Sequence, residues 1–106
     1  MVVPGPFTND HREEILALAA TVRLPDSYGV VENAKLGGFL AFGTDSPTMY
    51  RRAAEYVDKL LRGAKPEDLP IEQTTHFSLS VNLKRAKALG ITIPDSILLR
   101  ADEVIR

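Results

Sequence analysis

The stretch from Gly37 to Pro70 constrains the fold more than any other part of the sequence. After a glycine pair it carries a short continuous apolar run, Phe39-Leu40-Ala41-Phe42, which is typical of a parallel strand covered on both faces. A turn follows at Gly43-Thr44-Asp45-Ser46-Pro47. Asp45 or Ser46 can cap a helix, and Pro47 suits the first helical position because its missing N–H would be unbonded there.

The helix that begins at Pro47 is expected to be long and amphipathic. One face carries apolar residues at spacings of three and four, namely Tyr50, Ala53, Ala54, Val57, Leu60 and Leu61. On the other face, Glu55 with Lys59 and Asp58 with Arg62 form i,i+4 pairs with the acid first, which favours a solvated surface. Gly63 can adopt the left-handed conformation after a helix, and Pro66 prevents continuation.

The residues before this stretch alternate between helix and strand patterns. Asp10 with Glu13 has capping-box spacing, and the helix is expected to reach about Val22 with Ile15, Leu18, Ala19 and Val22 on its apolar side. A short strand near Asp26–Tyr28 and a helical turn at Glu32–Leu36 follow. This alternation predicts parallel βαβ units, and hence an α/β fold with a mostly parallel sheet and flanking helices.

After Pro70 the pattern changes to period two. His76, Ser78, Ser80 and Asn82 alternate with Phe77, Leu79, Val81 and Leu83, which predicts a strand with one buried and one polar face. Asn82 can cap a short helix that ends at Gly90. A further short helix is expected from Pro94 through Ala101, and a terminal strand at Glu103–Ile105.

Most of the chain resembles the C-terminal part of bacterial substrate-binding proteins of ABC (ATP-binding cassette) transporters. The resemblance rests on Gly37 to Gly43, Tyr50 to Pro70, Asn82 to Pro94 and Leu99 to Ile105. It implies a C-terminal segment of the two-lobed periplasmic-binding-protein-like fold, with residues up to about 42 in one lobe and residues from about 44 to 106 in, or returning through, the other.

The resemblance also implies a function. A protein of this family binds a small organic solute, with amino acids among the candidates, between its lobes and presents it to a membrane permease. It would lie in the periplasm or be anchored to the envelope. The first residues, Met1 to Pro6, lack a charged n-region and a signal-length apolar core, so we expect no signal peptide in this chain. The alternative is a cytoplasmic effector-sensing or oligomerisation module with no transport role, because similar α/β lobes serve in transcriptional regulators.

Composition excludes several other classes. The 106 residues suit one domain, and 44% hydrophobic residues are enough to form a core. With a net charge of −1 and no basic block interleaved with aromatics, no nucleic-acid partner is expected. No cysteine is present, and no phosphate-binding loop, nucleophile elbow or paired-histidine zinc helix occurs. We therefore expect no enzyme activity, no metal and no cofactor.

Ligand contacts are expected beyond the carboxyl ends of the strands, at Pro6–Asn9, Tyr28–Val31 and Gly43–Ser46. The candidate ligand-binding residues are Phe7, Tyr28, Gly43, Thr44 and Asp45. Phe7 and Tyr28 can form an apolar wall, or alternatively Phe7 packs on the following helix and Tyr28 in the core. Thr44 and Asp45 precede a helix N-terminus that attracts a carboxylate, although Asp45 is favoured as a helix cap because it would repel an anion.

A segment separated from the rest of a two-lobed protein exposes surfaces that the missing part covers. Large exposed apolar patches tend to find a partner. The sequence therefore predicts self-association of the isolated chain, as a homodimer or by strand exchange.

Overall fold

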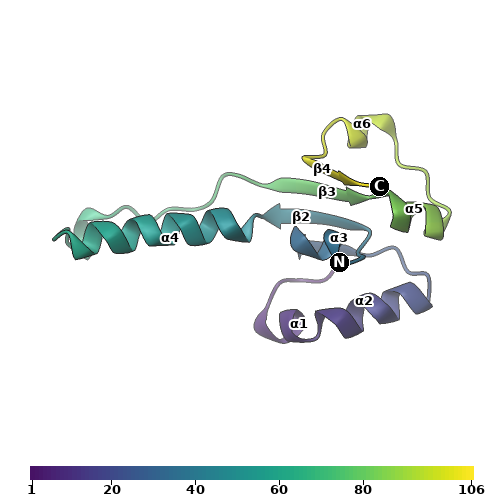
Figure 1. Cartoon of the computed structure of the whole chain (residues 1–106), viewed down its shortest axis with the longest axis horizontal. Helices are drawn as coiled ribbons and strands as arrows, with labels where there is room; N and C mark the ends of the chain where they lie inside the picture. Colours follow the sequence, from purple (N-terminus) through teal and green to yellow (C-terminus); the bar gives the residue numbers. More distant parts are fainter.

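The computed structural model describes all residues from 1 to 106 and contains one mixed four-stranded sheet (Figure 1). The strands are β1 (Ser27–Val30), β2 (Leu40–Thr44), β3 (Ser78–Asn82) and β4 (Glu103–Ile105), in the order β1-β2-β3-β4. β1 is parallel to β2, β3 is antiparallel to β2, and β4 is parallel to β3. The predicted α/β class is confirmed.

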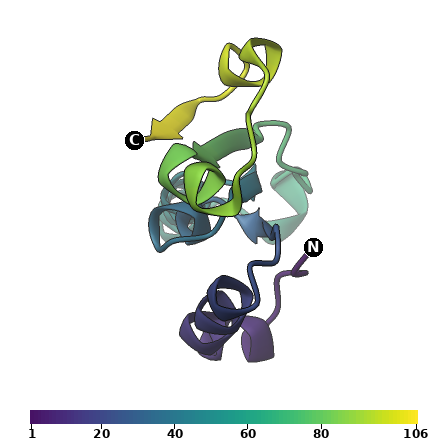
Figure 2. The ribbon, with the colours of Figure 1, turned by 90° about the vertical axis from the view of Figure 1, so that its right-hand side faces the viewer.

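Five short helices accompany the sheet: α1 (Pro6–Asp10), α2 (Arg12–Thr21), α3 (Glu32–Lys35), α5 (Leu83–Leu89) and α6 (Asp95–Leu98). Seen along the long axis of the molecule, α1 and α2 lie beyond the β1 end of the sheet and α6 lies beyond the β4 end (Figure 2). The predicted helical turn at Glu32, the cap at Asn82 and the terminal strand are confirmed, and Gly90 ends α5 with a φ of +72°.

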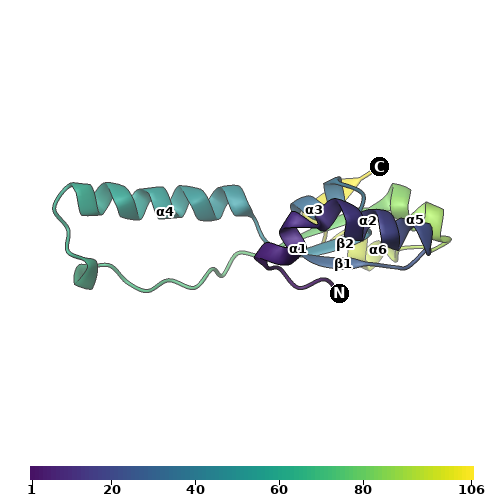
Figure 3. The ribbon, with the colours of Figure 1, turned by 90° about the horizontal axis from the view of Figure 1, so that it is seen from below.

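The longest helix, α4 (Ser46–Leu61), projects away from the sheet. The chain then passes through a 3₁₀ turn at Pro66–Asp68 and runs back along α4 to β3, so that residues 46–77 form an arm (Figures 1 and 3). The molecule measures 56 × 31 × 18 Å. The predicted cap is confirmed, because the Asp45 side chain accepts from the Thr48 N–H, and Gly63 has a φ of +103°. No residue of α4 is buried, and its apolar residues Tyr50, Val57 and Leu61 are 77%, 53% and 83% exposed.

The core lies on the face of the sheet that α3 covers. Tyr28 and Ala41 are cross-strand partners there, and they pack with Leu16 and Ala34. Ser80, opposite Ala41, is fully buried on this same face. The predicted polar face of β3 is therefore wrong: small polar side chains at Ser80 and Asn82 are buried because α3 packs against them, and Asn82 Nδ2 donates to Ala34 O at 3.0 Å.

The prediction that β2 is covered on both faces is also wrong. Its burial alternates, with Ala41 and Gly43 inside, while Phe42 is 60% exposed. Phe42 instead stacks on Phe77, which the sequence places on a buried face and which is 48% exposed, with ring centroids 5.7 Å apart. The exposure of both rings shows that no layer of the chain fully covers this part of the sheet.

The N-terminal helix differs from its prediction as well. The chain forms two helices that meet at His11, because Pro6 starts α1 early, and Asp10 ends α1 instead of capping α2. In α2, Leu16 and Ala19 are buried, whereas Leu18, predicted on the apolar side, is 65% exposed. The helix still ends next to Val22, as predicted.

Candidate functional site

Three segments of the chain end at the same edge of the sheet, the edge from which α4 departs. Val2 forms a parallel bridge with Tyr28, and its N–H donates to Ser27 O at 2.7 Å. Because β1 also runs parallel to β2, the residues that follow Val2, Val30 and Thr44 all lie at this edge, which we call the carboxyl edge. Ligands of open α/β sheets bind at such edges.

The three segments at the carboxyl edge approach each other closely at Gly29 and Gly43. A Cβ atom at Gly29 would lie 2.6 Å from Pro4 Cγ, and one at Gly43 would lie 1.9 Å from Gly29 O. The β1–β2 register shifts at this point, between Tyr28 and Val30. Gly43 thus has a packing role that is independent of any ligand, and half-buried Thr44 follows it at the end of β2.

Asp45 lies at the carboxyl edge, where its side chain caps the N-terminus of α4. Its Oδ2 accepts from the Thr48 N–H at 3.2 Å and from the Thr48 hydroxyl. The hydroxyl and backbone N–H of Thr48, together with the cations of Lys35 and Arg51, hold the pKa of Asp45 below its usual value. A charged carboxylate at the helix N-terminus repels anions, which leaves the edge better suited to an ammonium or a neutral polar group.

Tyr28 is a core residue in this chain, with 2% of its surface exposed. Its hydroxyl donates to Asp26 Oδ2 at 2.6 Å, while Asp26 Oδ1 accepts from the Phe39 N–H at 3.2 Å and lies 3.8 Å from Arg85 Nε. Burial, followed by the bond to Asp26, raises the pKa of Tyr28 above its usual value. Because Asp26 and Phe39 precede β1 and β2, the hydroxyl is directed toward the edge opposite the carboxyl edge.

Phe7 is 71% exposed on α1 and stacks on His11, with ring centroids 4.4 Å apart. It therefore packs at the junction of α1 and α2 and still presents most of its surface to solvent. Of the five candidate residues, Gly43, Thr44 and Asp45 are consecutive at the carboxyl edge, Phe7 lies in the segment that follows Val2, and Tyr28 is enclosed. Their roles in binding a ligand stay predictions.

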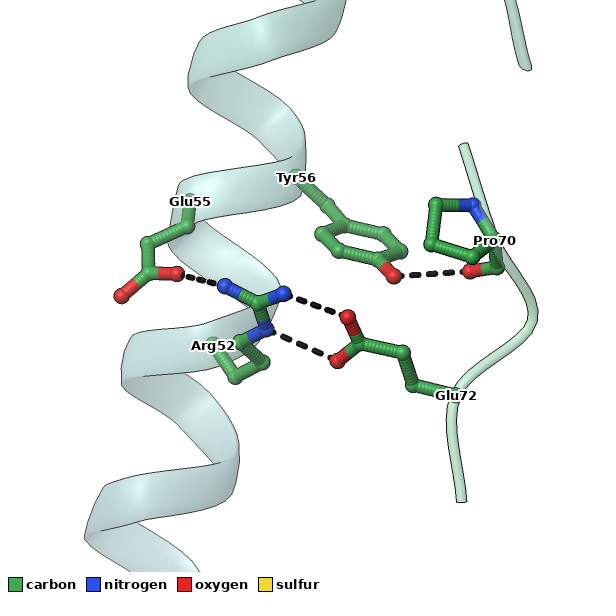
Figure 4. A network of polar contacts seen from close by, with 5 residues as sticks. All are labelled: Arg52, Glu55, Tyr56, Pro70 and Glu72. Atoms are coloured by element: carbon green, nitrogen blue, oxygen red, sulfur yellow. Dashed lines mark hydrogen bonds and ion pairs between the residues drawn. The ribbon is translucent and has the colours of Figure 1, made fainter. Parts of the chain in front are cut away.

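Apart from the carboxyl edge, a groove of about 660 Å³ lies in the arm between α4 and the returning segment. An ionic network spans it (Figure 4). Arg52 Nε donates to Glu72 Oε2 at 2.8 Å, and the Arg52 guanidinium also bonds Glu72 Oε1 and Glu55. Beside it, the Tyr56 hydroxyl donates to Pro70 O at 2.7 Å. These contacts clasp the returning segment to α4.

We call the contacts of Arg52 and Tyr56 with the returning segment the clasp. Electrostatics favour the charged states of Arg52 and Glu72 in it. Hydrogen bonds from Arg52, supported by Tyr56 and Lys59, lower the pKa of Glu72 to about 2. The same carboxylate raises the pKa of Arg52. Of the two ion pairs expected on α4, Asp58 with Arg62 is present at 3.0 Å, whereas Glu55 pairs with Arg52 in place of Lys59.

Neither the carboxyl edge nor the groove in the arm brings together the groups of a catalytic or metal site. No three His, Asp or Glu side chains are placed to hold a metal ion. Ser80, on the strand that follows His76, is buried and donates to Glu103 Oε2 at 3.4 Å.

The model of the family described as ABC transporter substrate binding protein matches residues 9–105 of the chain. The chain belongs to this family. Its name describes a binding protein, not an enzyme. No helix of this family member is long and apolar enough to cross a membrane. No curated protein sequence matches it.

Two solved structures have the same fold as this family member. One is a conserved domain protein from Vibrio cholerae O1 biovar El Tor, with a TM-score of 0.88, 24% identity, and coverage of 96% of this chain and 34% of that chain. The other is an ABC domain from Streptococcus pneumonia in complex with L-Trp, with a TM-score of 0.84, 26% identity, and coverage of 92% and 34%. The chain thus spans about a third of each solved chain.

Two features of this substrate-binding family member could not be found by reading the sequence. The Arg52–Glu72 pair joins residues 20 positions apart, and Glu72 lies in a segment with no periodic pattern. The Gly29–Gly43 contact depends on the β1–β2 register. The only sequence signal for the second was a glycine directly after each of two predicted strands, Gly29 after Tyr28 and Gly43 after Phe42.

Proposed function

We propose that this chain is part of the solute-binding component of an ABC-type importer, and that the longer protein binds a small organic solute between two lobes. The family match over residues 9–105 carries the proposal. The solved ABC domain in complex with L-Trp supports amino acids as one class of solute to test. The membrane permease is the expected protein partner, and the periplasm or envelope the expected location.

The arrangement of the chain supports a division between two lobes. Residues up to Thr44 and from Ser78 onward share one sheet, and only two strand segments, adjacent at Gly43 and Ser78, connect this sheet to the arm. We propose that the sheet belongs to one lobe and that the arm of residues 46–77 contributes to the other. The carboxyl edge then lies next to the crossing.

This geometry gives the proposed mechanism. A solute that contacts both lobes favours the closed state over the open state by the difference in its affinity for the two. Rotation about a few residues at Gly43–Asp45 and at the start of β3 would close the lobes, and the permease would recognise the closed form. Asp45 would lie at the entrance to the closed cleft and favour a solute with an ammonium group.

The test is an immunoblot of the source cells with an antibody raised against this chain, on cytoplasmic and envelope fractions. We expect an envelope band at about three times the 11.7 kDa of this chain. Protein captured with the same antibody is then heat-denatured, and released small molecules are identified by mass spectrometry against a capture with pre-immune serum. We expect an amino acid or a similar small solute.

A cytoplasmic band at 11.7 kDa would contradict the transport proposal. It would favour the alternative, a cytoplasmic effector-sensing or oligomerisation module.

A further inference from the structure

The arm of residues 46–77 contains no part of the hydrophobic core. All 15 buried residues of the chain lie outside it, and every residue from 46 to 77 is exposed or half-buried. Burial of apolar surface is the dominant favourable term in folding. The core therefore stabilises the sheet and the helices packed on it, and no fully buried side chain stabilises the arm.

The arm is joined to the sheet almost only by the chain itself (Figures 1 and 3). At its start the Asp45 side chain caps α4, and at its end the Phe77 ring stacks on Phe42. Apart from the bonds of Asp45, no hydrogen bond or ion pair connects residues 46–77 with the rest of the chain. Because the entropic cost of closing a loop rises only slowly with its length, β2 and β3 can stay paired when the residues between them lose their structure.

α4 has little to stabilise it as a helix. Its 16 residues are close to the length of about 12–15 below which isolated helices are marginal in water, and most helices in proteins depend on the packing of an apolar face. The apolar stripe of α4, formed by Tyr50, Val57 and Leu61, is exposed. The shorter α2, with 10 residues, packs Leu16 and Ala19 into the core instead.

The clasp is the main polar link between α4 and the returning segment, residues 70–77. No backbone–backbone hydrogen bond involves these residues, so side chains hold the segment to α4. The Arg52 guanidinium bonds both oxygens of the Glu72 carboxylate, and the Tyr56 hydroxyl donates to Pro70 O (Figure 4). A bidentate pair of this kind is stronger than a neutral hydrogen bond and fixes its own geometry. Breaking it frees the returning segment from α4.

We propose that the arm is a separate conformational unit, which opens and closes while the sheet stays folded, and that the clasp is the latch of the closed form. In the closed form Arg52 holds Glu72 and α4 is helical. In the open form this pair is broken and α4 unwinds. Local opening free energies within one protein range from near zero to the global value, and segments with few buried contacts lie at the low end.

This inference is independent of the proposed solute and transporter, since it concerns residues 1–106 alone and the immunoblot does not depend on it. It makes the arm the part of the chain whose order responds to contact. A surface that binds only the closed form shifts the equilibrium toward that form and leaves the sheet unchanged.

The first experiment is amide hydrogen exchange of the purified chain, followed by NMR in water and in low concentrations of urea. We expect the amides of α4 to be protected at least about a hundredfold less than the paired amides of β2 and β3, with a smaller dependence on urea, because local opening exposes less surface than global unfolding. α2 is the internal control, since helix length alone would make the longer α4 the better protected. Protection of α4 equal to or above that of α2, or a urea dependence equal to that of the sheet, would overturn the separate opening of the arm.

The second experiment repeats the exchange measurement on Arg52→Gln. Arg and Gln have similar helix propensities, so this variant removes the latch and keeps the preference of α4 for helix. The matched control is Arg51→Gln, at the neighbouring exposed arginine, which forms no ion pair. We expect the protection of α4 to fall about fivefold in Arg52→Gln only, the upper end for an exposed ion pair, with unchanged protection of β2 and β3.

Three results would contradict the latch. Unchanged protection of α4 in Arg52→Gln, or an equal loss in Arg51→Gln, would show that the clasp does not hold the arm closed. An equal loss of protection in the sheet would show that the arm and the sheet open together.

Discussion

Replacing Gly43 by Ala tests the packing at the carboxyl edge most directly. The new Cβ would lie 1.9 Å from Gly29 O, which is 1.5 Å short of the 3.4 Å at which ordinary contact begins. The obstacle is backbone, so it cannot rotate away as a side chain would. β1 and β2 must separate locally, and the ladder at the Val30–Thr44 pair is lost.

The magnitude follows from that separation. Losing about two ladder hydrogen bonds at about 0.5–1.5 kcal/mol each gives about 1–3 kcal/mol, the same range as overpacking a well-filled core. We therefore expect Gly43→Ala to lower the free energy of unfolding by about 2 kcal/mol. With a urea m-value of about 1–3 kcal/mol/M, the midpoint falls by about 1 M.

The assay is urea unfolding followed by far-UV circular dichroism, with Gly5→Ala as the matched control. A Cβ at Gly5 would meet Thr8 Oγ1 at 3.8 Å, an ordinary contact, and the φ of Gly5 is −175°, which any residue adopts. The control should stay within about 0.5 kcal/mol of wild type. An unchanged midpoint for Gly43→Ala, or an equal loss in the control, would refute the close approach of β1 and β2.

Two further predictions concern Tyr28 and the clasp of the arm. Because Tyr28 is 2% exposed, Tyr28→Ala should lower the free energy of unfolding in urea by about 3 kcal/mol or more. A smaller loss, together with weaker solute binding by the longer protein, would instead identify Tyr28 as a ligand-binding residue. For Glu72, an NMR titration of the side-chain carboxyl carbon should give a pKa of about 2, rising toward the ordinary 4.5 in Arg52→Gln but not in the control Arg100→Gln. Since the folded pKa is depressed, the stabilisation by this pair is present above pH 4.5 and lost as the pH falls toward 2. An unchanged Glu72 pKa in Arg52→Gln would contradict the clasp.

Local signals in the sequence were sufficient for most elements. Asp45 and Asn82 cap α4 and α5 as predicted, because a capping side chain bonds an N–H only three residues away. Gly63 and Gly90 follow these helices with positive φ. These decisions depend on neighbours in the chain, which the sequence shows directly.

Burial was predicted less well, because it depends on what packs against each face. Alternation in β3 was read correctly as a strand, yet Ser80 lies inside and Phe77 is half exposed. From polarity alone, Ser80 is expected on the exposed face and Phe77 on the buried face. The position of α3 decides the inner face, since a fully buried Ser80 leaves room for this helix to approach the sheet.

The candidate site was also predicted in part, because the positions of its residues along the chain are local properties and the directions of their side chains are not. The sequence placed Gly43, Thr44 and Asp45 after a strand, and the parallel pairing of β1 with β2 brings the ends of three segments to one edge. Tyr28, also proposed from its position near a strand end, directs its hydroxyl to Asp26 at the opposite edge. The direction of a side chain depends on strand register and on the partners it meets, which are distant in the sequence.

The sequence by itself determined the α/β class, the ends of α4 and α5 and the family, because hydrophobic period, caps and local motifs are short-range properties of the chain. Only the tertiary structure decided that α4 and the returning segment leave the sheet as an arm, that Arg52 reaches Glu72, and that the apolar stripe of α4 is uncovered. The physical reason is that periodicity specifies which face of an element is apolar, whereas the contacts that cover this face come from residues far away in the sequence or from another chain.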